Sequence, residues 1–233
     1  MNCNQFQRTE LLFGTDGLHR LYQSSVTVVG CGAVGSFAVE ALARTGVGHL
    51  SLIDGDTVSV SNINRQICAL HSTVGQFKVE VLKSRINDIC PDTRVDTFPV
   101  FLNSDNCAAL FTHTPDFVID AIDLIEGKVA LIHYLQQEKI PFISSMGAAL
   151  KTDFSKIKAA PLNQTSVCPL AARLRKVLKE KQCHLNFPCV FSTERPVGDK
   201  KPGRQMGSLV SVTGLFGLIL ANEVILKLVK QHE

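Results

Sequence analysis

Aromatic residues are scarce in this 233-residue sequence, which has no tryptophan and only two tyrosines. Because 45% of its residues are nevertheless apolar, aliphatic side chains must fill most of the core. The length suits one α/β domain of ordinary size. The composition therefore predicts a single globular domain with an aliphatic interior.

The sequence also lacks an apolar targeting segment. Residues 1–8 are polar, which is not the composition of a signal peptide. The most apolar stretch, residues 209–229, is interrupted at Asn222 and Glu223, so it falls short of the ~18 apolar residues of a membrane span. We therefore expect no membrane contact, a cytoplasmic location, and a buried core helix within residues 209–229.

None of the eight cysteines forms a C-x-x-C pair. This argues against a structural zinc site of the usual four-thiolate kind, so no zinc is expected. Without a secretion signal, reduced thiols are the default state. Cys168, Cys183 and Cys189 are predicted to pack in or near the core. Cys168 also remains open as a nucleophile, since basic neighbours lower the pKa of a thiol.

Runs of strand length alternate with helical patterns over the first 150 residues. The strand-like runs cover residues 26–29, 50–53, 95–99, 117–121 and 142–145. The helical patterns cover residues 34–45, 76–89, 105–111 and 127–138. Such alternation predicts an α/β fold with a mostly parallel, Rossmann-like sheet and helices on both faces. We interpret residues 1–233 as one domain, with a core in 1–150 and a C-terminal basic extension of helix and loops in 151–233.

Positive charge is concentrated in that extension. Residues 151–205 hold 12 Lys or Arg and 4 Asp or Glu, while the whole chain has a net charge of only +3. One predicted helix carries four of these cations, namely Arg173, Arg175, Lys176 and Lys179. A solvated helix would explain them. Confinement to one segment is also the electrostatic pattern of a nucleic-acid surface.

A glycine-rich turn, here called the glycine loop (residues 30–35, GCGAVG), follows the first apolar run and opens a helix. Gly30, Gly32 and Gly35 let backbone N–H groups approach a phosphate at the positive end of that helix. On its own this loop fits ATP or a dinucleotide. Asp54, at the end of the second strand, is placed to accept hydrogen bonds from ribose hydroxyls.

Two cations decide between these nucleotides. Arg65 and Lys78, with the amides of Asn62 and Gln66 nearby, supply more positive charge than a bound dinucleotide requires. Neutralising a departing pyrophosphate does require this additional positive charge. Asp123 ends another strand, at the edge where ligands of open α/β sheets lie, and can hold Mg²⁺ beside phosphates. This pattern predicts an ATP-cleaving site.

At this point the sequence resembles the adenylating domain of the MoeB/ThiF/HesA superfamily, relatives of ubiquitin-activating enzymes. The resemblance rests on GCGAVGS, LIDGD, SNINRQ, VGQFKVE and DAID, in that order. It implies that ATP is held by a set of polar residues together with the glycine loop: Asp54, Asn62, Arg65, Gln66 and Lys78. It further implies Mg²⁺ at Asp123 and a homodimer whose partner supplies an arginine, with Arg8 and Gly14 matching the spacing.

Longer segments resemble one branch, the tRNA threonylcarbamoyladenosine dehydratases. These segments are RTELLFG, EALARTGVG, ISSMGA, TSVCPLA and VFSTE. The branch implies ATP-dependent cyclisation of N6-threonylcarbamoyladenosine in tRNA. Ring closure is intramolecular, so it needs no carrier protein or enzyme thiol. A sulfur-relay partner is associated with the branch, but residues 200–208 lack the cysteine that some members carry.

Three other functions stay open. The first is adenylation of the C-terminus of a sulfur-carrier or ubiquitin-like protein, which normally accompanies C-x-x-C pairs. The second is an NAD-dependent oxidoreductase, which would use the glycine loop and Asp54 but leave Arg65, Lys78 and Asp123 without a role. The third is a non-catalytic nucleotide-binding scaffold, against which the complete set of charged residues argues.

Overall fold

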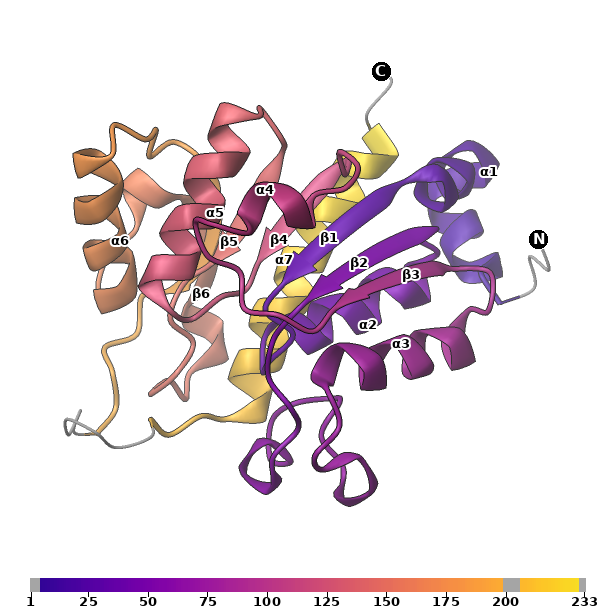
Figure 1. Cartoon of the computed structure of the whole chain (residues 1–233), viewed down its shortest axis with the longest axis horizontal. Helices are drawn as coiled ribbons and strands as arrows, with labels where there is room; N and C mark the ends of the chain where they lie inside the picture. Colours follow the sequence, from indigo (N-terminus) through magenta and orange to yellow (C-terminus); the bar gives the residue numbers. More distant parts are fainter. Residues whose placement is uncertain (1–4, 199–205, 231–233) are drawn as a thin grey trace.

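One seven-stranded sheet runs through the molecule, with the strand order β3-β2-β1-β4-β5-β7-β6 (Figure 1). The computed structural model describes residues 5–198 and 206–230. The strands are β1 (Ser25–Val29), β2 (His49–Ile53), β3 (Arg94–Phe98), β4 (Phe117–Asp120), β5 (Phe142–Ser145), β6 (Ile157–Pro161) and β7 (Pro188–Ser192). Six of them run parallel, and β6 pairs antiparallel with β7 at one edge. The carboxyl ends of the parallel strands therefore share one edge of the sheet.

Helices cover both faces of this sheet. They are α1 (Gln7–Gln23), α2 (Gly35–Thr45), α3 (Lys78–Ile89), α4 (Cys107–Leu110), α5 (Ile125–Gln137), α6 (Pro169–Glu180) and α7 (Val210–Lys230). Apolar residues of α2, α3 and α7 enter one core cluster with the sheet, and those of α5 and α6 enter another on the opposite face. The predicted Rossmann-like α/β architecture is confirmed.

The spacing of apolar residues explains how α2 meets the sheet. Its buried positions Ala38, Val39, Leu42 and Ala43 recur every three to four residues and form one face. The helix ends at Gly46, whose φ of +99° is the left-handed conformation that closes many helices. The other end of α2 is left at the carboxyl edge, directly after the glycine loop.

The C-terminal helix packs against α2. Among the described residues, α7 is the one helix whose length and apolar composition would allow it to cross a membrane. However, 56% of its most apolar stretch is buried inside the protein. A Cβ on Gly217 would lie only 2.2 Å from the carbonyl oxygen of Val34, and one on Gly214 would lie 3.0 Å from the Phe37 ring. These small residues let the two helices approach closely, as expected for a core helix.

Residues beyond 150 contribute more to the sheet than their sequence pattern indicates. The alternation of apolar strands and helices stops near residue 150, and we expected only helix and loops thereafter. The structure adds β6 and β7, which extend the sheet past β5. Residues 199–204 of the basic extension, which we expect to form a loop, lie outside the described residues. The described part of the extension contains β6, α6, β7 and α7.

Candidate functional site

The glycine loop joins β1 to α2 at the carboxyl edge of the sheet. Gly30 has a φ of +88°, and a Cβ there would lie 2.7 Å from the carbonyl oxygen of Ala121. A Cβ on Gly35 would lie 1.8 Å from the carbonyl oxygen of Gly30. A Cβ on Gly32 would have room, because its nearest neighbour is the side-chain nitrogen of Gln66 at 3.7 Å. Gly30 and Gly35 are therefore required for close packing, whereas Gly32 leaves the backbone of the loop accessible.

This difference gives a matched pair of variants. We expect Gly35→Ala to lower stability by about 1–3 kcal/mol or more through overpacking. Gly32→Ala is expected to keep its melting temperature but to bind ATP more weakly, since the methyl group covers N–H groups that face a phosphate. Thermal unfolding and ATP calorimetry measure the two effects. Unchanged ATP affinity in Gly32→Ala would contradict the phosphate-binding role.

The start of α2 is suited to an anion. Val34 occupies the N-cap position and provides no side-chain cap. The hydroxyl of Ser36, which is buried, accepts a hydrogen bond from the N–H of Ile67 at 3.2 Å and fixes the neighbouring turn. The N–H groups of Ser36 and Phe37 already donate to the carbonyl oxygens of Gly32 and Val34. The positive end of the helix dipole and the N–H groups of the glycine loop before them are therefore what this helix start offers to a ligand.

Asp54 fastens the glycine loop to the end of β2. Its carboxylate accepts hydrogen bonds from the N–H of Cys31 at 2.6 Å and from the N–H of Asp56 at 2.8 Å. Burial raises the pKa of Asp54, and the positive charge of Lys78 opposes that effect. The side chain is thus positioned beside the loop, where the sequence predicts a ribose contact.

Lys78 is brought to the same place from the first turn of α3. Its side chain is 5% exposed, and its Nζ lies 2.6 Å from a carboxylate oxygen of Asp56. The Asp56 side chain is 53% exposed, so an incoming phosphate can replace it as the partner of the ammonium. Lys78 is also close enough to Asp54 and Cys68 to influence their pKa values.

The remaining predicted ATP residues lie around the short helix η1 (Val60–Asn62). Gln66 is buried and places its amide beside Gly32. Arg65 is half-buried, and its guanidinium donates to the carbonyl oxygen of Ser61 at 2.7 Å. Asn62 accepts from the N–H of Ser59 at 3.1 Å, which shapes the turn. Gln66 therefore meets the glycine loop directly, while Arg65 and Asn62 are hydrogen-bonded within their own segment.

Asp123 lies just beyond β4 at the carboxyl edge, and its side chain is exposed. It is thus accessible for a cation that a nucleotide brings. Among residues 5–198 and 206–230, no group of three or more His, Cys, Asp or Glu could hold a metal by itself. A single carboxylate plus phosphate oxygens is a usual arrangement for Mg²⁺, so the predicted Mg²⁺ contact stays a prediction.

A buried polar cluster, which the sequence did not lead us to expect, supports this edge. Lys128 and Asp120 are both fully buried, with Nζ and a carboxylate oxygen 2.7 Å apart. The Ser144 hydroxyl donates to the same carboxylate at 2.6 Å. The other oxygen of Asp120 accepts from the N–H of Ile122 at 3.1 Å, which shapes the turn toward Asp123. The available signal was a lone lysine inside the apolar pattern of α5.

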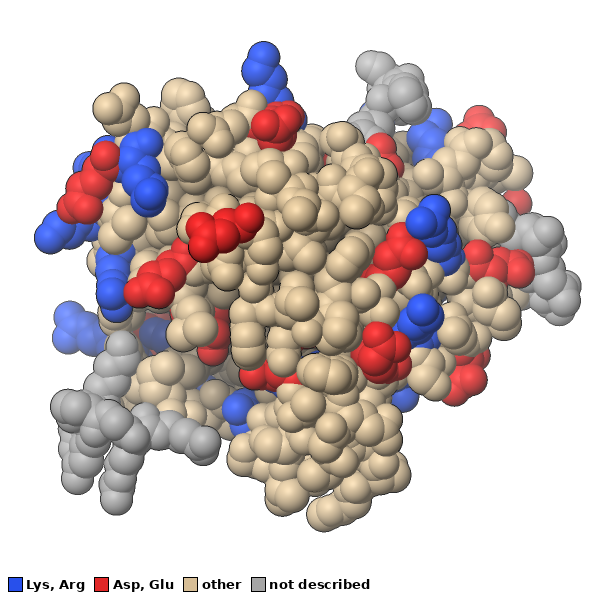
Figure 2. All heavy atoms as spheres, in the orientation of Figure 1, with Lys and Arg blue, Asp and Glu red and all other residues tan. Residues whose placement is uncertain are grey.

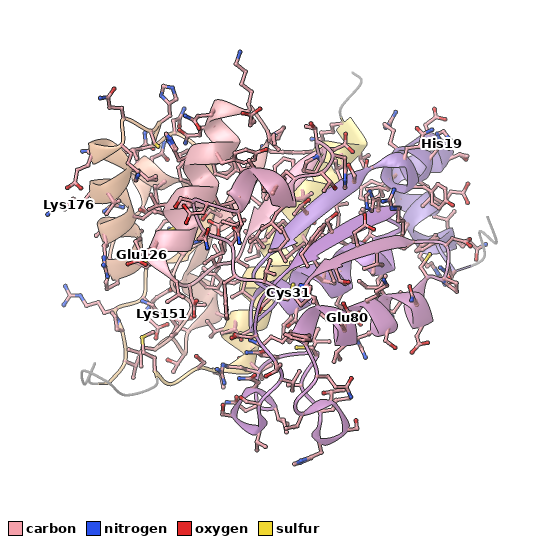
Figure 3. The ribbon with its side chains drawn as sticks, viewed as in Figure 1. His19, Cys31, Glu80, Glu126, Lys151 and Lys176 are labelled. Atoms are coloured by element: carbon pink, nitrogen blue, oxygen red, sulfur yellow. The ribbon has the colours of Figure 1, made fainter. Side chains whose placement is uncertain are left out.

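Burial disfavours ionisation of the two thiols near the glycine loop. Burial raises the pKa of Cys31 well above its usual value, and it raises the pKa of Cys68 to about 11. Cys31 sits at the centre of the molecule, at the start of α2 (Figure 3). Thiols with raised pKa values are poor nucleophiles. These two cysteines therefore act as small packing residues.

The three cysteines of the extension also pack rather than cluster. Cys168 and Cys189 are buried in the core beneath α6, and burial raises the pKa of Cys189 to about 12. Cys183 is half-buried, with its sulfur 3.4 Å from Nδ1 of His133. All seven cysteines in the described residues are free thiols.

Arg8 lies far from the glycine loop of its own chain. It is exposed near the start of α1. The neighbouring Phe6 packs against the far end of α2, with a ring carbon 3.5 Å from a Cβ built on Gly46. An 11-residue helix spans about 16 Å, and the glycine loop is at its other end. The same chain therefore does not bring Arg8 to the site.

The four predicted RNA-binding cations are all on α6, but they differ in orientation. Arg173, Lys176 and Lys179 are exposed. Arg175 is half-buried and donates to the carbonyl and hydroxyl oxygens of Thr165. Figure 2 shows basic side chains gathered along the molecular edge that α6 forms. Three of the four side chains thus face solvent, whereas Arg175 holds the turn before α6.

A glycine loop at an uncapped helix start, with a lysine and a carboxylate beside it, is an arrangement typical of nucleotide sites in Rossmann-like sheets. The sequence matches the ThiF family over residues 6–233, and the chain belongs to this family.

Two relatives are tRNA threonylcarbamoyladenosine dehydratases. The Bacillus subtilis protein is 38% identical, over 99% of this chain and 96% of that protein. The Escherichia coli protein is 37% identical, over 96% and 93% of the two chains. The fold is similar to that of the E. coli tRNA N6-threonylcarbamoyladenosine dehydratase in complex with ATP. In that comparison the TM-score is 0.92 with 39% identity, over 98% of this chain and 95% of the other.

Proposed function

We propose that this protein is an ATP-dependent tRNA-modifying enzyme that cyclises N6-threonylcarbamoyladenosine. The observation that carries the proposal is the intact nucleotide site, in which the glycine loop, Asp54 and Lys78 lie together. Relatives with the dehydratase name align over nearly the whole chain. Activation of a sulfur-carrier protein is less well supported, because the sequence lacks the C-x-x-C pairs that normally accompany that activity. Because adenylation accounts for the charged residues that hydride transfer would leave unused, it is favoured over NAD-dependent oxidoreduction.

The reaction has two steps. The substrate carboxylate attacks the α-phosphorus of ATP, pyrophosphate leaves, and an acyl-adenylate mixed anhydride forms. An atom of the carbamoyl group on the same substrate then attacks the acyl carbon. The bond to the AMP oxygen breaks, a proton is released, and a ring closes. ATP ends as AMP and pyrophosphate, and one carboxylate oxygen leaves with AMP. Proximity within one substrate makes the second step favourable.

The charged residues divide this work. Lys78 and Arg65 stabilise the negative charge that develops on the leaving pyrophosphate. Asn62 and Gln66 orient the nucleotide next to the glycine loop, and Asp54 accepts from the ribose hydroxyls. Asp123 would hold Mg²⁺ together with phosphate oxygens, and the ion would supply further charge neutralisation when bound. The acyl end of the substrate lies over the carboxyl ends of β4 and β5.

Mass spectrometry of tRNA nucleosides tests the activity. The protein is incubated with ATP, Mg²⁺ and tRNA that carries the threonylcarbamoyl adenosine. The expected product nucleoside is lighter by one water, and AMP appears in equal amount. A protein that releases pyrophosphate only with a small Gly-Gly-tailed protein, and never with tRNA, would overturn the proposal in favour of carrier activation.

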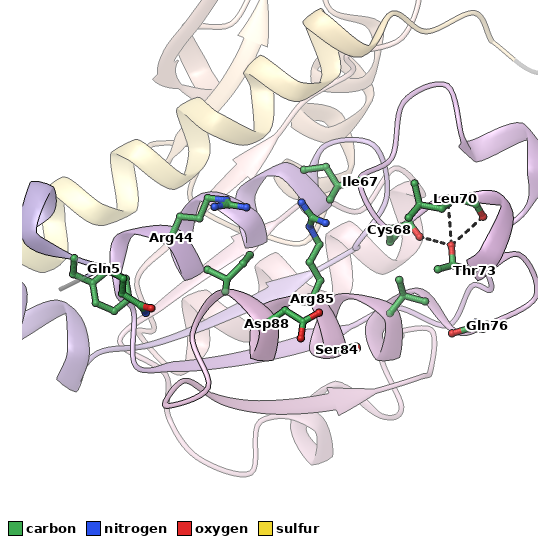
Figure 4. Close-up of a pocket in the computed structure, with 13 residues that line it drawn as sticks. Gln5, Arg44, Ile67, Cys68, Leu70, Thr73, Gln76, Ser84, Arg85 and Asp88 are labelled. Carbon is green, nitrogen blue, oxygen red and sulfur yellow. Dashed lines mark hydrogen bonds between the residues drawn. The ribbon is translucent and has the colours of Figure 1, made fainter. Parts of the chain in front are cut away.

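We also propose that the enzyme works as a homodimer in which Arg8 enters the partner's site. Four features support this arrangement. Arg8 is remote from its own loop, and Leu11 and Leu12 nearby are each 74% exposed. The lobe of residues 57–77, which carries little charge, projects from the body (Figure 2). A groove of about 590 Å³ runs along α2 and α3 between that lobe and the N-terminal segment (Figure 4).

Mixing two inactive variants tests this arrangement. Arg8→Ala and Lys78→Ala should each be inactive alone, because every site needs its own Lys78 and the partner's Arg8. Random mixing restores about a quarter of the sites, since half the dimers are mixed and each has one complete site. The measurement is tRNA cyclisation after exchange of subunits. If mixing restores no activity, Arg8 does not act across the dimer.

The basic face of α6 is proposed to bind tRNA. We expect the triple variant Arg173→Gln, Lys176→Gln and Lys179→Gln to bind tRNA more weakly and to reduce the slope of log affinity against log salt by about 2–3. Arg175 is left intact because it holds Thr165. Lys83→Gln is the control, since α3 lies on the other face of the sheet. A slope equal to that of wild type would show that α6 is not the binding surface.

Two further expectations belong here. We propose a cytoplasmic location, since tRNA modification requires access to tRNA. A sulfur-relay partner would need an accessible thiol, whereas six of the seven described cysteines are buried and residues 200–208 contain no cysteine.

A further inference from the structure

A second groove lies at the opposite edge of the sheet, where β4, β5 and β7 begin. We call it the amino-edge groove, and its volume is about 510 Å³. The first residues of these strands, Phe117, Phe142 and Pro188, contribute to it. The rings of Phe142 and Phe187 pack with centroids 4.9 Å apart and give it an apolar floor. This groove is within the size range of nucleotide-sized ligand sites.

The charge of the amino-edge groove has one sign. Lys139 and Lys227 line it, with the imidazole of His184, and none of its lining residues is Asp or Glu. The Lys227 ammonium is held 5.6 Å from the centre of the Phe117 ring. Lys139 has a φ of +57°, an uncommon conformation for a side chain other than glycine. Both cations are exposed at the rim.

Hydrogen bonds fix one wall of this groove. The side chain of Gln136 donates to the carbonyl oxygen of His184 and accepts from its N–H, both at 2.8 Å. This pair attaches the segment after α6 to the end of α5. The wall is therefore preformed and does not require a ligand for its shape.

The groove continues the basic face of α6. The segment that leaves α6 passes through Lys181 and reaches His184 at the groove. Lys176, labelled in Figure 3, lies on the outer side of α6. Lys181 and His184 therefore connect the basic face of α6 to the amino edge, with the exposed Glu180 as the one acidic residue from Arg173 to His184. The distance from this groove to the carboxyl edge is about the length of β4, roughly 13 Å for four residues.

We infer that the amino-edge groove holds an unpaired stretch of the tRNA strand that flanks the adenosine being modified. This inference rests on the proposed function. Lys139 and Lys227 contact backbone phosphates, and the exposed imidazole of His184 offers a face on which a base stacks. Cations beside a stacking ring are the combination by which proteins recognise single-stranded nucleic acid. At about 3.4 Å per stacked nucleotide, four or five nucleotides cover the distance between the two edges.

Equilibrium binding of a tRNA anticodon stem-loop tests the inference. The variant combines Lys139→Asn, since Asn tolerates the left-handed backbone, with Lys227→Gln. Its dissociation constant is expected to rise about tenfold, and its salt slope to fall by about 1.4, for two single-strand phosphate contacts. Lys83→Gln is the matched control. Melting temperatures check that both variants fold, and Lys227→Gln alone serves as a second variant.

Ultraviolet crosslinking of photoreactive uridines in the same RNA gives an independent measurement. Crosslinks to residues 139–142 or 184–188 are expected. A double variant that matches Lys83→Gln in affinity and slope, or crosslinks confined to other segments, overturns the inference. If wild type cyclises tRNA while the double variant is unaffected, only the groove is refuted. If wild type neither binds nor cyclises tRNA, the proposed function fails as well.

Discussion

Replacing Lys78 or Arg65 by alanine is expected to reduce ATP-dependent turnover about 10²–10³-fold or more while the fold survives. Each removes positive charge that meets the leaving pyrophosphate in the transition state. The fold should tolerate Lys78→Ala, because its partner Asp56 is 53% exposed and stays hydrated when the lysine is lost. Single-turnover AMP formation and thermal unfolding measure the two properties separately.

Conservative variants sharpen this result. Arg65→Lys keeps the charge but loses the planar fork, so partial activity would show that geometry matters as well as charge. Asp56→Asn removes the partner of Lys78 without touching the phosphates, and we expect it to retain most of its turnover. Normal activity in both alanine variants would overturn the assignment of an ATP-cleaving site. A variant that loses activity only because its melting temperature falls below the assay temperature would instead indicate a purely structural role.

Lys128→Met is expected to destabilise the protein by about 3–5 kcal/mol, the largest stability effect that we predict. The fully buried Lys128 lies 2.7 Å from the fully buried Asp120. Removing the ammonium leaves a carboxylate in the core with only Ser144 and the N–H of Ile122 as partners. Denaturant unfolding measures the change in free energy.

A double-mutant cycle measures the interaction between Asp120 and Lys128 separately from their other contacts. Asp120→Asn keeps an acceptor for the N–H of Ile122 but carries no charge. The double variant Asp120→Asn and Lys128→Met should therefore be more stable than Lys128→Met alone, since no buried charge is left without a partner. If the two losses simply add, the pair is not coupled. Lys139→Met, on the same side of the sheet but exposed, is the control, with an effect within about 0.5 kcal/mol.

The position of the glycine loop could be predicted from sequence because the residues that determine its conformation are adjacent in the chain. Only glycine permits the close contacts at Gly30 and Gly35, and the apolar strand before them fixes the position of the turn. Asp54 follows the next strand by the same logic, because parallel strands end at a shared edge. The structure confirms the Rossmann-like fold on which these arguments depended.

Contacts between distant segments could not be predicted. The pairing of Asp120 with Lys128 and Ser144 depends on how α5 packs on β4 and β5. The inward orientation of Arg175 depends on the turn at Thr165, which a charge count along α6 does not reveal. The strand β6 lies at a sheet edge and has no fully buried residue, so its residues carry a weak apolar pattern.

Among the missed elements, α1 and β7 had different causes. The apolar run of β7 stood among polar and basic residues, beyond residue 150, where the regular alternation of strands and helices ends. The helix α1 contains Gly14 with a φ of +73°, which interrupts its regular pattern. The position of α1 depends on its packing against α7, and that of β7 on its pairing with β5 and β6. Periodicity along the sequence does not capture such contacts between distant segments.

The contact between Gly217 and the carbonyl oxygen of Val34 has a consequence for how the chain acquires its shape during synthesis. The helix α2, which follows the glycine loop, packs against α7, the last helix of the described chain. Most of the sequence separates these two helices. Contacts so distant form late, since the closure of long loops must come first. The nascent chain can therefore make strands and turns early, but the loop reaches its working geometry only after α7 has left the ribosome.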